Sequence, residues 1–149
     1  MATVFLAGSL PIRVLSAEAV VRLDNLMKLG VHFVVGDAPG ADTLLQKYLY
    51  SKGYPNVTVY AVGSRVRNNI GNWQVQHIDP DPNATRRDYY VAKDIAMTEV
   101  SDVGLMLWDR VSRGTRANIL RLISQGKKAI VITSQGAFPV TTEQDLILI

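Results

Sequence analysis

Short apolar segments recur along the chain and alternate with segments of helical spacing. The apolar segments are rich in β-branched residues and show little alternation with polar residues, which is typical of strands covered on both faces. They lie at residues 3–7, 31–35, 57–62, 103–108 and 129–133. Five strands of this kind predict a mainly parallel sheet whose interior positions are apolar throughout.

The segments between these strands carry apolar residues at helical spacing. They predict helices from Ser16 to Gly30, from about Ala41 to Ser51, over 85–101 and from Thr115 to Gln125. In the third helix the expected inward face carries Tyr89, Ala92, Ala96 and Val100. Because strands and helices alternate, we expect an α/β fold with a doubly wound, mainly parallel five-stranded sheet and helices on both faces.

Two segments do not fit this alternation. Residues 63–84 contain two prolines and little periodicity, and they predict a long loop that is either functional or mobile. Trp73 lies in this loop. We expect it either to close over a ligand as a lid or to pack onto the domain or onto a second subunit.

The chain ends in four apolar residues, 146–149, which favour an extra edge strand or a dimer contact over a free tail. We therefore expect a homo-oligomer, most simply a dimer.

Composition narrows the class of protein. A chain of 149 residues with 48% hydrophobic and 19% charged residues is expected to form one globular domain over 1–149. No apolar run approaches the roughly 20 residues that span a bilayer, and the N-terminus lacks the basic region of a secretory signal. We therefore expect a cytoplasmic protein without a membrane partner.

The counts of cysteine, histidine and basic residues limit the chemistry. The chain has no cysteine, which excludes thiolate catalysis and cysteine-ligated metal clusters. Its two histidines argue against a histidine-rich metal site, and we expect no metal or other cofactor. The net charge is +3 and no basic run exceeds two residues, which argues against a dedicated nucleic-acid binder.

Three predicted loops carry small or polar residues directly after strands. They contain Gly8 and Ser9, the sequence GDAPGAD at 36–42, and the sequence WDRVSRGTRANI at 108–119. In an open parallel sheet, ligands bind beyond the carboxyl ends of the strands, where the strand order reverses. If the five strands lie in the order 3-2-1-4-5, these three loops lie side by side.

The third loop has the features of an anion site. Ser112, Gly114 and Thr115 precede a helix whose free N–H groups, together with the Thr115 hydroxyl, can surround a phosphate. Arg113 and Arg116 add positive charge there. The alternative is that Thr115 is only a helix cap.

The GDAPGAD loop places Asp37 and Asp42 where they would repel an anion. We therefore predict that phosphate binds at residues 112–115, while Asp37 or Asp42 takes sugar hydroxyls or a base edge. The alternative is that Asp42 only caps the second helix. Gly36 and Gly40 belong to the same turn.

Other side chains near the predicted edge have two interpretations each. Trp108 either stacks on a planar base or covers the edge of the sheet. Arg65 and Arg67 either contact a second anionic group or lie in solvent. Lys93 either reaches the ligand or is a solvated charge on the helix surface.

The segments FLAGS, VVGDAPGADTLLQKYL, KDIAMTEVSDVGLMLWD and SRGTRANI together resemble the SLOG superfamily. This Rossmann-like group includes DprA-type DNA-uptake proteins, the LOG cytokinin-activating phosphoribohydrolases, and the YpsA-like and YspA-like proteins. GDAPGAD resembles the YspA-like branch and WDRVSRGT the YpsA-like pattern, and the similarity covers about residues 3–133. The resemblance implies a Rossmann-like fold that binds a nucleotide or nucleotide-derived ligand. The residues it implies for this site are Gly8, Ser9, Gly36, Asp37, Gly40, Asp42, Asp109, Ser112, Gly114 and Thr115.

One departure from the family pattern bears on catalysis. The hydrolytic LOG proteins carry a glutamate three residues after the threonine of their Gly-Thr motif, and this chain has Asn118 there. An asparagine cannot act as a carboxylate base or stabilise an oxocarbenium ion by charge. The leading hypothesis is therefore a nucleotide-binding domain that acts as a sensor or carrier.

Two alternatives stay open. The first is an N-glycosidase or phosphoribohydrolase whose carboxylate has moved to Asp109 or Asp37, with Asp42 as a further candidate. The second is DprA-like DNA binding, for which the sequence offers only scattered arginines.

Overall fold

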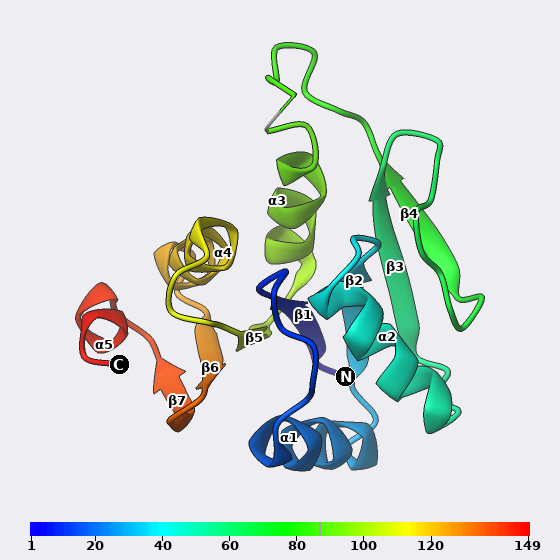
Figure 1. Cartoon of the computed structure of the whole chain (residues 1–149). Coiled ribbons are helices and arrows are strands. Elements are labelled where there is room, and N and C mark those ends of the chain that lie inside the picture. Colours follow the sequence, from blue (N-terminus) through cyan, green and yellow to red (C-terminus); the bar gives the residue numbers. More distant parts are fainter. Residues whose placement is uncertain (87) are drawn as a thin grey trace.

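The computed structural model describes residues 1–86 and 88–149, and it shows one sheet with helices on both faces (Figure 1). The sheet contains β1 Thr3–Gly8, β2 His32–Gly36, β3 Val57–Val62, β4 Gln74–Ile78, β5 Val103–Leu107, β6 Lys128–Thr133 and β7 Gly136–Val140. The strands lie in the order β4-β3-β2-β1-β5-β6-β7. Every pairing from β4 to β6 is parallel, and β7 pairs antiparallel with β6.

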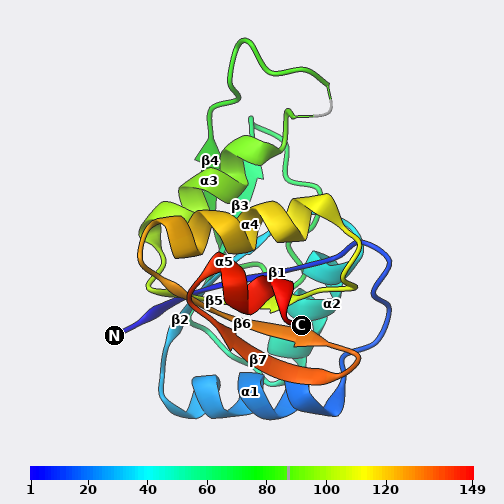
Figure 2. The ribbon, with the colours of Figure 1, turned by 90° about the vertical axis from the view of Figure 1, so that its left-hand side faces the viewer.

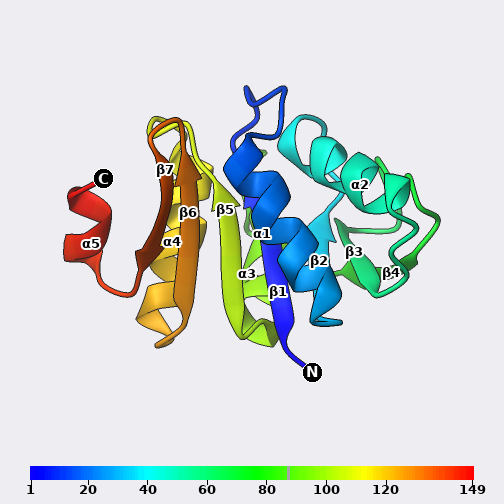
Figure 3. The same ribbon diagram turned by 90° about the horizontal axis from the view of Figure 1, so that it is seen from below.

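The helices divide between the two faces of the sheet. Their bounds are α1 Ala17–Lys28, α2 Ala41–Ser51, α3 Val91–Val100, α4 Arg113–Ser124 and α5 Glu143–Ile147. Helices α1 and α2 cover one face, and α3, α4 and α5 lie on the other (Figures 2 and 3). Ser16 caps α1 by accepting a hydrogen bond from the N–H of Ala19 at 3.2 Å. This arrangement is the doubly wound architecture that the alternating pattern predicts.

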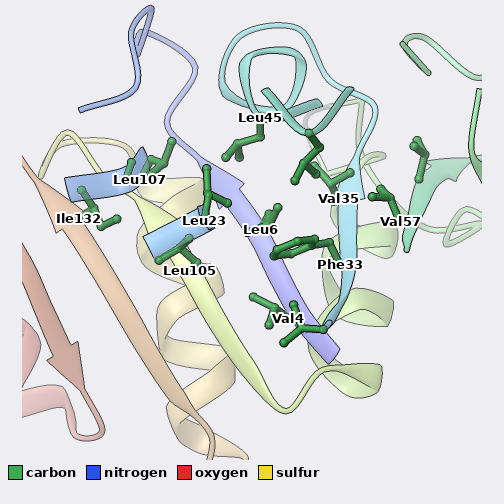
Figure 4. Packing of buried hydrophobic residues seen from close by; sticks show 14 residues of the cluster. Val4, Leu6, Leu23, Phe33, Val35, Leu45, Val57, Leu105, Leu107 and Ile132 are labelled. Carbon is green, nitrogen blue, oxygen red and sulfur yellow. The ribbon is translucent and has the colours of Figure 1, made fainter. Parts of the chain in front are cut away.

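The core consists of two clusters, one on each face of the sheet. Along β1 the side chains of Val4 and Leu6 belong to the cluster beneath α1 and α2 (Figure 4), whereas Phe5 belongs to the cluster beneath α3 and α4. The same alternation holds in β2, where Phe33 lies on the first face and Val34 on the second. Strands buried on both faces therefore explain why these segments are apolar at every position.

The five predicted strands are all present, and they lie in the predicted order. The prediction of five strands in total is wrong, because the sheet has seven. The additional strands β4 and β7 lie at the two edges, where one side of a strand has no neighbour. In β4 the exposed residues Gln74, Gln76 and His77 leave little apolar signal. This strand occupies part of the segment that the sequence predicts as a loop.

Trp73, just before β4, packs onto the domain. Its indole N–H donates to the carbonyl oxygen of Tyr54 at 3.0 Å, and its ring packs against the core cluster beneath α1 and α2. The lid alternative is therefore wrong, and Trp73 gives no support for a dimer. The predicted edge strand exists, but residues 136–140 form it. Of the final apolar residues, Leu146 is buried in α5, whereas Ile147 and Leu148 are exposed.

The third predicted helix differs in its start and in its inward face. It begins at Val91 rather than at 85, and residue 87 of the predicted range lies outside the described residues. The buried residues of α3 are Lys93, Met97 and Thr98, while Val100 is 49% exposed. The helix is therefore rotated by about one residue from the predicted face, and a lysine lies where an alanine was expected.

Candidate ligand site at the carboxyl edge of the sheet

The strand connections reverse direction at β1, which has β2 on one side and β5 on the other. Such a reversal opens a crevice beyond the carboxyl ends of the strands. A cavity of about 660 Å³ lies at this edge, between the loop after β1 and the N-terminal ends of α2, α3 and α4. Its volume is within the range of about 300–1,000 Å³ found for small-molecule sites.

The first turn of α4 forms one wall of this cavity. Ser112 is the N-cap residue, but its side chain makes no capping bond to the helix and instead donates to Asp109 Oδ2 at 2.8 Å. The first N–H groups of a helix have no acceptor within the helix, and this turn holds Arg113 and no acidic residue. A Cβ built on Gly114 would meet no atom within 4 Å. The backbone of this turn is therefore open to the cavity and suited to an anion.

Ser9 joins the loops that surround this turn. Its side chain is buried, and its Oγ lies 3.2 Å from Thr115 Oγ1. The N–H of Asp109 donates to the same Oγ at 3.2 Å. The hydroxyl thus connects the end of β1, the loop after β5 and the first turn of α4. Gly8 lets α2 approach, since a Cβ there would lie 2.8 Å from the Cβ of Ala41.

On the opposite side of the cavity, Asp42 lies at the start of α2 beside Lys93. Asp42 is 8% exposed, and the N–H of Ala38 donates to its Oδ2 at 3.1 Å. Gly36 makes room for this pair, because a Cβ there would lie 2.4 Å from Asp42 Oδ2 and 2.9 Å from Lys93 Nζ. Burial raises the pKa of Asp42 to about 6, and attraction to Lys93 offsets only part of this effect. Asp42 therefore titrates just below neutral pH.

Lys93 is a buried ammonium group at the base of the cavity. Burial alone would lower its pKa, but attraction to Asp94 and Asp42 outweighs burial and holds the pKa above its ordinary value. Lys93 Nζ lies 2.9 Å from Asp94 Oδ1. Asn118 Nδ2 lies 3.4 Å from Asp94 Oδ2, and Arg121 donates to Asn118 Oδ1 at 2.6 Å. A line of polar groups thus joins α3 to α4.

Asp37 does not reach the cavity. Its side chain is 1% exposed, and its Oδ1 accepts a hydrogen bond from Arg67 Nη2 at 2.8 Å. Its Oδ2 accepts the backbone N–H of Arg67 at 2.9 Å, and its carbonyl oxygen accepts Asn68 Nδ2 at 2.9 Å. Asp37 therefore fastens the loop after β3 to the end of β2, and its burial outside the cavity lining keeps its carboxylate away from a ligand in the cavity.

Asp109 and Trp108 also have structural roles. Asp109 Oδ1 accepts the N–H groups of Val111 and Ser112 at 2.9 and 2.7 Å. Burial raises the pKa of Asp109, but these bonds outweigh burial and hold the pKa below its ordinary value. Trp108 is 7% exposed in the core and its indole N–H donates to the Ser112 carbonyl oxygen at 3.1 Å. Both line a separate cavity of about 350 Å³ on the side of α1.

The predicted site residues thus divide into two groups. The main cavity is lined by Gly8, Ser9, Asp42, Ser112, Arg113, Gly114 and Thr115. Gly36, Asp37, Gly40, Trp108 and Asp109 lie outside its lining. Gly36 and Gly40 support the geometry instead: Gly40 has a φ of 84°, and a Cβ there would lie 2.7 Å from the Leu10 carbonyl oxygen.

The cavity is also lined by side chains that no clear sequence pattern marks as ligand contacts. Arg67 lines the cavity, whereas one of its two interpretations from the sequence placed it in solvent. Lys93 is buried and is not a solvated charge on the helix surface. Tyr90 and Asp94 line the cavity as well. For Tyr90, Lys93 and Asp94, the local signal in the sequence is that they fall within one helical turn at the carboxyl edge of the sheet.

The described residues contain no group of three or more His, Cys, Asp or Glu side chains arranged to hold a metal ion. Among the same residues, no helix has the length and apolar character needed to cross a membrane. In comparisons with known proteins, no protein-family model and no curated protein matches this chain.

Proposed function

We propose that this chain binds a nucleotide or nucleotide-derived ligand in the 660 Å³ cavity and acts as a sensor or carrier of that ligand. The observation that carries the proposal is the first turn of α4, where Gly114 leaves the backbone open to the cavity and the turn itself contains no acidic residue. A phosphate of the ligand would accept hydrogen bonds from this turn and face the positive end of the helix.

The wall of the cavity opposite α4 has side chains suited to binding a sugar, which in a nucleotide lies between the phosphate and the base. Asp42, Lys93 and Asp94 offer carboxylate acceptors and an ammonium donor within the same cavity. Vicinal hydroxyls both donate and accept hydrogen bonds, so a mixed cluster of this kind suits them better than it suits a second phosphate. The resemblance to the SLOG superfamily leads to the same ligand class.

The test uses Gly114→Val, which adds a branched side chain where the backbone meets the cavity. Calorimetric titration with nucleoside mono-, di- and triphosphates, ADP-ribose and cyclic nucleotides first identifies a ligand for the wild type. We expect Gly114→Val to weaken that ligand at least about 100-fold, since several backbone hydrogen bonds of about 1 kcal/mol each are obstructed together.

Ala117→Val is the matched control, because it adds the same side chain to the same helix outside the cavity lining. Thermal unfolding would check that both variants are folded. Equal affinity of wild type and a folded Gly114→Val protein would place the ligand elsewhere, and failure of every probe to bind the wild type would refute the proposal.

A second candidate is cleavage of a nucleotide N-glycosidic bond. The observation that favours it is Asp94, whose Oδ2 lies 3.4 Å from Asn118 Nδ2 within the cavity lining. A carboxylate is therefore present near the position where hydrolytic LOG proteins carry a glutamate. Asp37 and Asp109 do not line this cavity and are therefore weaker candidates for this role.

A further inference from the structure

Arg67 and Tyr90 form a stacked pair on the wall of the main cavity. The guanidinium carbon of Arg67 lies 3.7 Å from the centroid of the Tyr90 ring, which places the cation over the face of the ring. Both side chains line the cavity, and Tyr90 remains 41% exposed despite this contact. An aromatic ring and the guanidinium group that lies over it therefore contribute to the same wall of the cavity.

The position of this pair is fixed from behind by buried residues. Asp37 holds both the backbone N–H and the guanidinium of Arg67, at 2.9 and 2.8 Å. Gln46 is fully buried and spans the same loop, since its Nε2 donates to the carbonyl oxygens of Gly36 and Asn68 and its Oε1 accepts the N–H of Ile70. An arginine on a loop after a strand would ordinarily be mobile, whereas this one is held in place before any ligand arrives.

The local bonding of Arg67 shows that the stack is not explained by its ion pair alone. Its Nε is buried and has no hydrogen-bond partner among the described residues. In a side-on two-point contact with the carboxylate, the guanidinium would use Nε as well as Nη2. Here only Nη2 contacts the carboxylate of Asp37, while the guanidinium carbon lies over the Tyr90 ring.

We propose that Arg67 and Tyr90 are the base-recognition surface of the site, so that the ligand is a nucleotide whose base stacks on this pair while its phosphate lies at the first turn of α4. This inference rests on the proposed nucleotide function and adds the orientation of the ligand and the residues that distinguish a nucleotide from a simple sugar phosphate. Stacking tolerates every base, because each has a π face.

The experiment compares the four common nucleoside 5′-monophosphates with ribose 5-phosphate, which carries the same sugar and phosphate without a base. In calorimetric titrations of the wild type, the best nucleotide is expected to bind at least about tenfold more tightly than ribose 5-phosphate. Tyr90→Leu is expected to abolish this ratio, because the nucleotide loses the ring on which its base stacks. Tyr90→Phe is expected to retain the ratio, since it keeps the ring.

Tyr50→Leu serves as the matched control, because Tyr50 is 60% exposed on α2 and does not line the cavity. A wild type that binds ribose 5-phosphate as tightly as any nucleotide would overturn the base-recognition surface but leave a sugar-phosphate site at α4. The base-recognition surface would also be overturned if Tyr90→Leu kept the wild-type ratio between the affinities for the best nucleotide and for ribose 5-phosphate. If the wild type binds neither the monophosphates nor ribose 5-phosphate, this inference fails, and the proposed function fails as well only if the di- and triphosphates, ADP-ribose and cyclic nucleotides also do not bind.

Discussion

Asp42 provides a test of the electrostatics of the site that needs no ligand. Its carboxyl group is 8% exposed, and its pKa is raised from 3.8 to about 6 mainly by burial. The folded protein therefore binds a proton at Asp42 more tightly than the unfolded chain does. As the pH rises from about 4 to about 6, this group lowers the free energy of unfolding.

The size of the effect follows from the pKa values. A rise from 3.8 to about 6 corresponds to on the order of 3 kcal/mol at pH 7. Asp42→Asn removes the titration but keeps an oxygen that can accept the N–H of Ala38. We therefore expect the variant to match the wild type near pH 4 and to exceed its free energy of unfolding by up to about 3 kcal/mol at pH 7. The attraction to Lys93 is already contained in this net value.

Urea unfolding at pH 4, 5, 6 and 7 would measure the difference between wild type and variant. Asp109→Asn is the matched control, because the pKa of Asp109 is lowered and its stabilising contribution is lost only as the pH falls through that lower value. This control is expected to be less stable than the wild type by a nearly constant amount from pH 5 to 7. If the difference in the free energy of unfolding between Asp42→Asn and the wild type does not grow between pH 4 and 7, the prediction that Asp42 is a buried, proton-binding carboxyl group is refuted.

Three other outcomes are expected. Asp37→Asn should lower the free energy of unfolding by about 2 kcal/mol in urea titrations, because it leaves the partly buried Arg67 without its charge partner; an unchanged midpoint would contradict this role. The wild type should release no free base from nucleoside monophosphates in chromatographic assays, and Asn118→Glu should introduce slow release of base. If the wild type releases base and Asp94→Asn abolishes this release, the result favours a glycosidic-bond-cleaving enzyme instead. Light scattering at tens of micromolar should give a dimer that Leu148→Lys dissociates, since Leu148 is 74% exposed, and a monomeric wild type would count against it.

The central strands were predictable from the sequence because both of their faces are buried. In β5, Leu105 and Met106 are adjacent in sequence but belong to different core clusters, so neither position tolerates a polar residue. The edge strand β4 pairs with β3 alone, and its exposed polar residues resemble those of a loop. A pattern of apolar residues reveals that a strand is buried, but it does not reveal that the backbone of the strand is paired. Edge strands have a paired backbone and few buried side chains, so they are the strands that such a pattern misses most often.

For the candidate site, the sequence predicts the position of a residue where that position depends on the local backbone. Gly114 and Thr115 lie in the first turn of a helix that follows a strand, and both facts are visible in the sequence. The roles of the two aspartates of GDAPGAD depend on distant partners. Asp37 pairs with Arg67 and Asp42 lies beside Lys93, and no local pattern specifies either contact. The rotation of α3 by about one residue was enough to turn Lys93 inward.

Charge is divided unequally between the walls of the cavity, which bears on how the acidic loop and the proposed anion site can share one sheet edge. The carboxylate of Asp37 is matched by Arg67 and lies outside the cavity lining. Asp42 and Asp94 face one ammonium group, that of Lys93, so their side of the cavity is neutral to negative. The first turn of α4 carries Arg113 and the positive end of the helix dipole. Under the proposed function, the phosphate of the ligand is therefore expected at α4 rather than at α2, with the hydroxyl groups of its sugar facing Asp42 and Asp94.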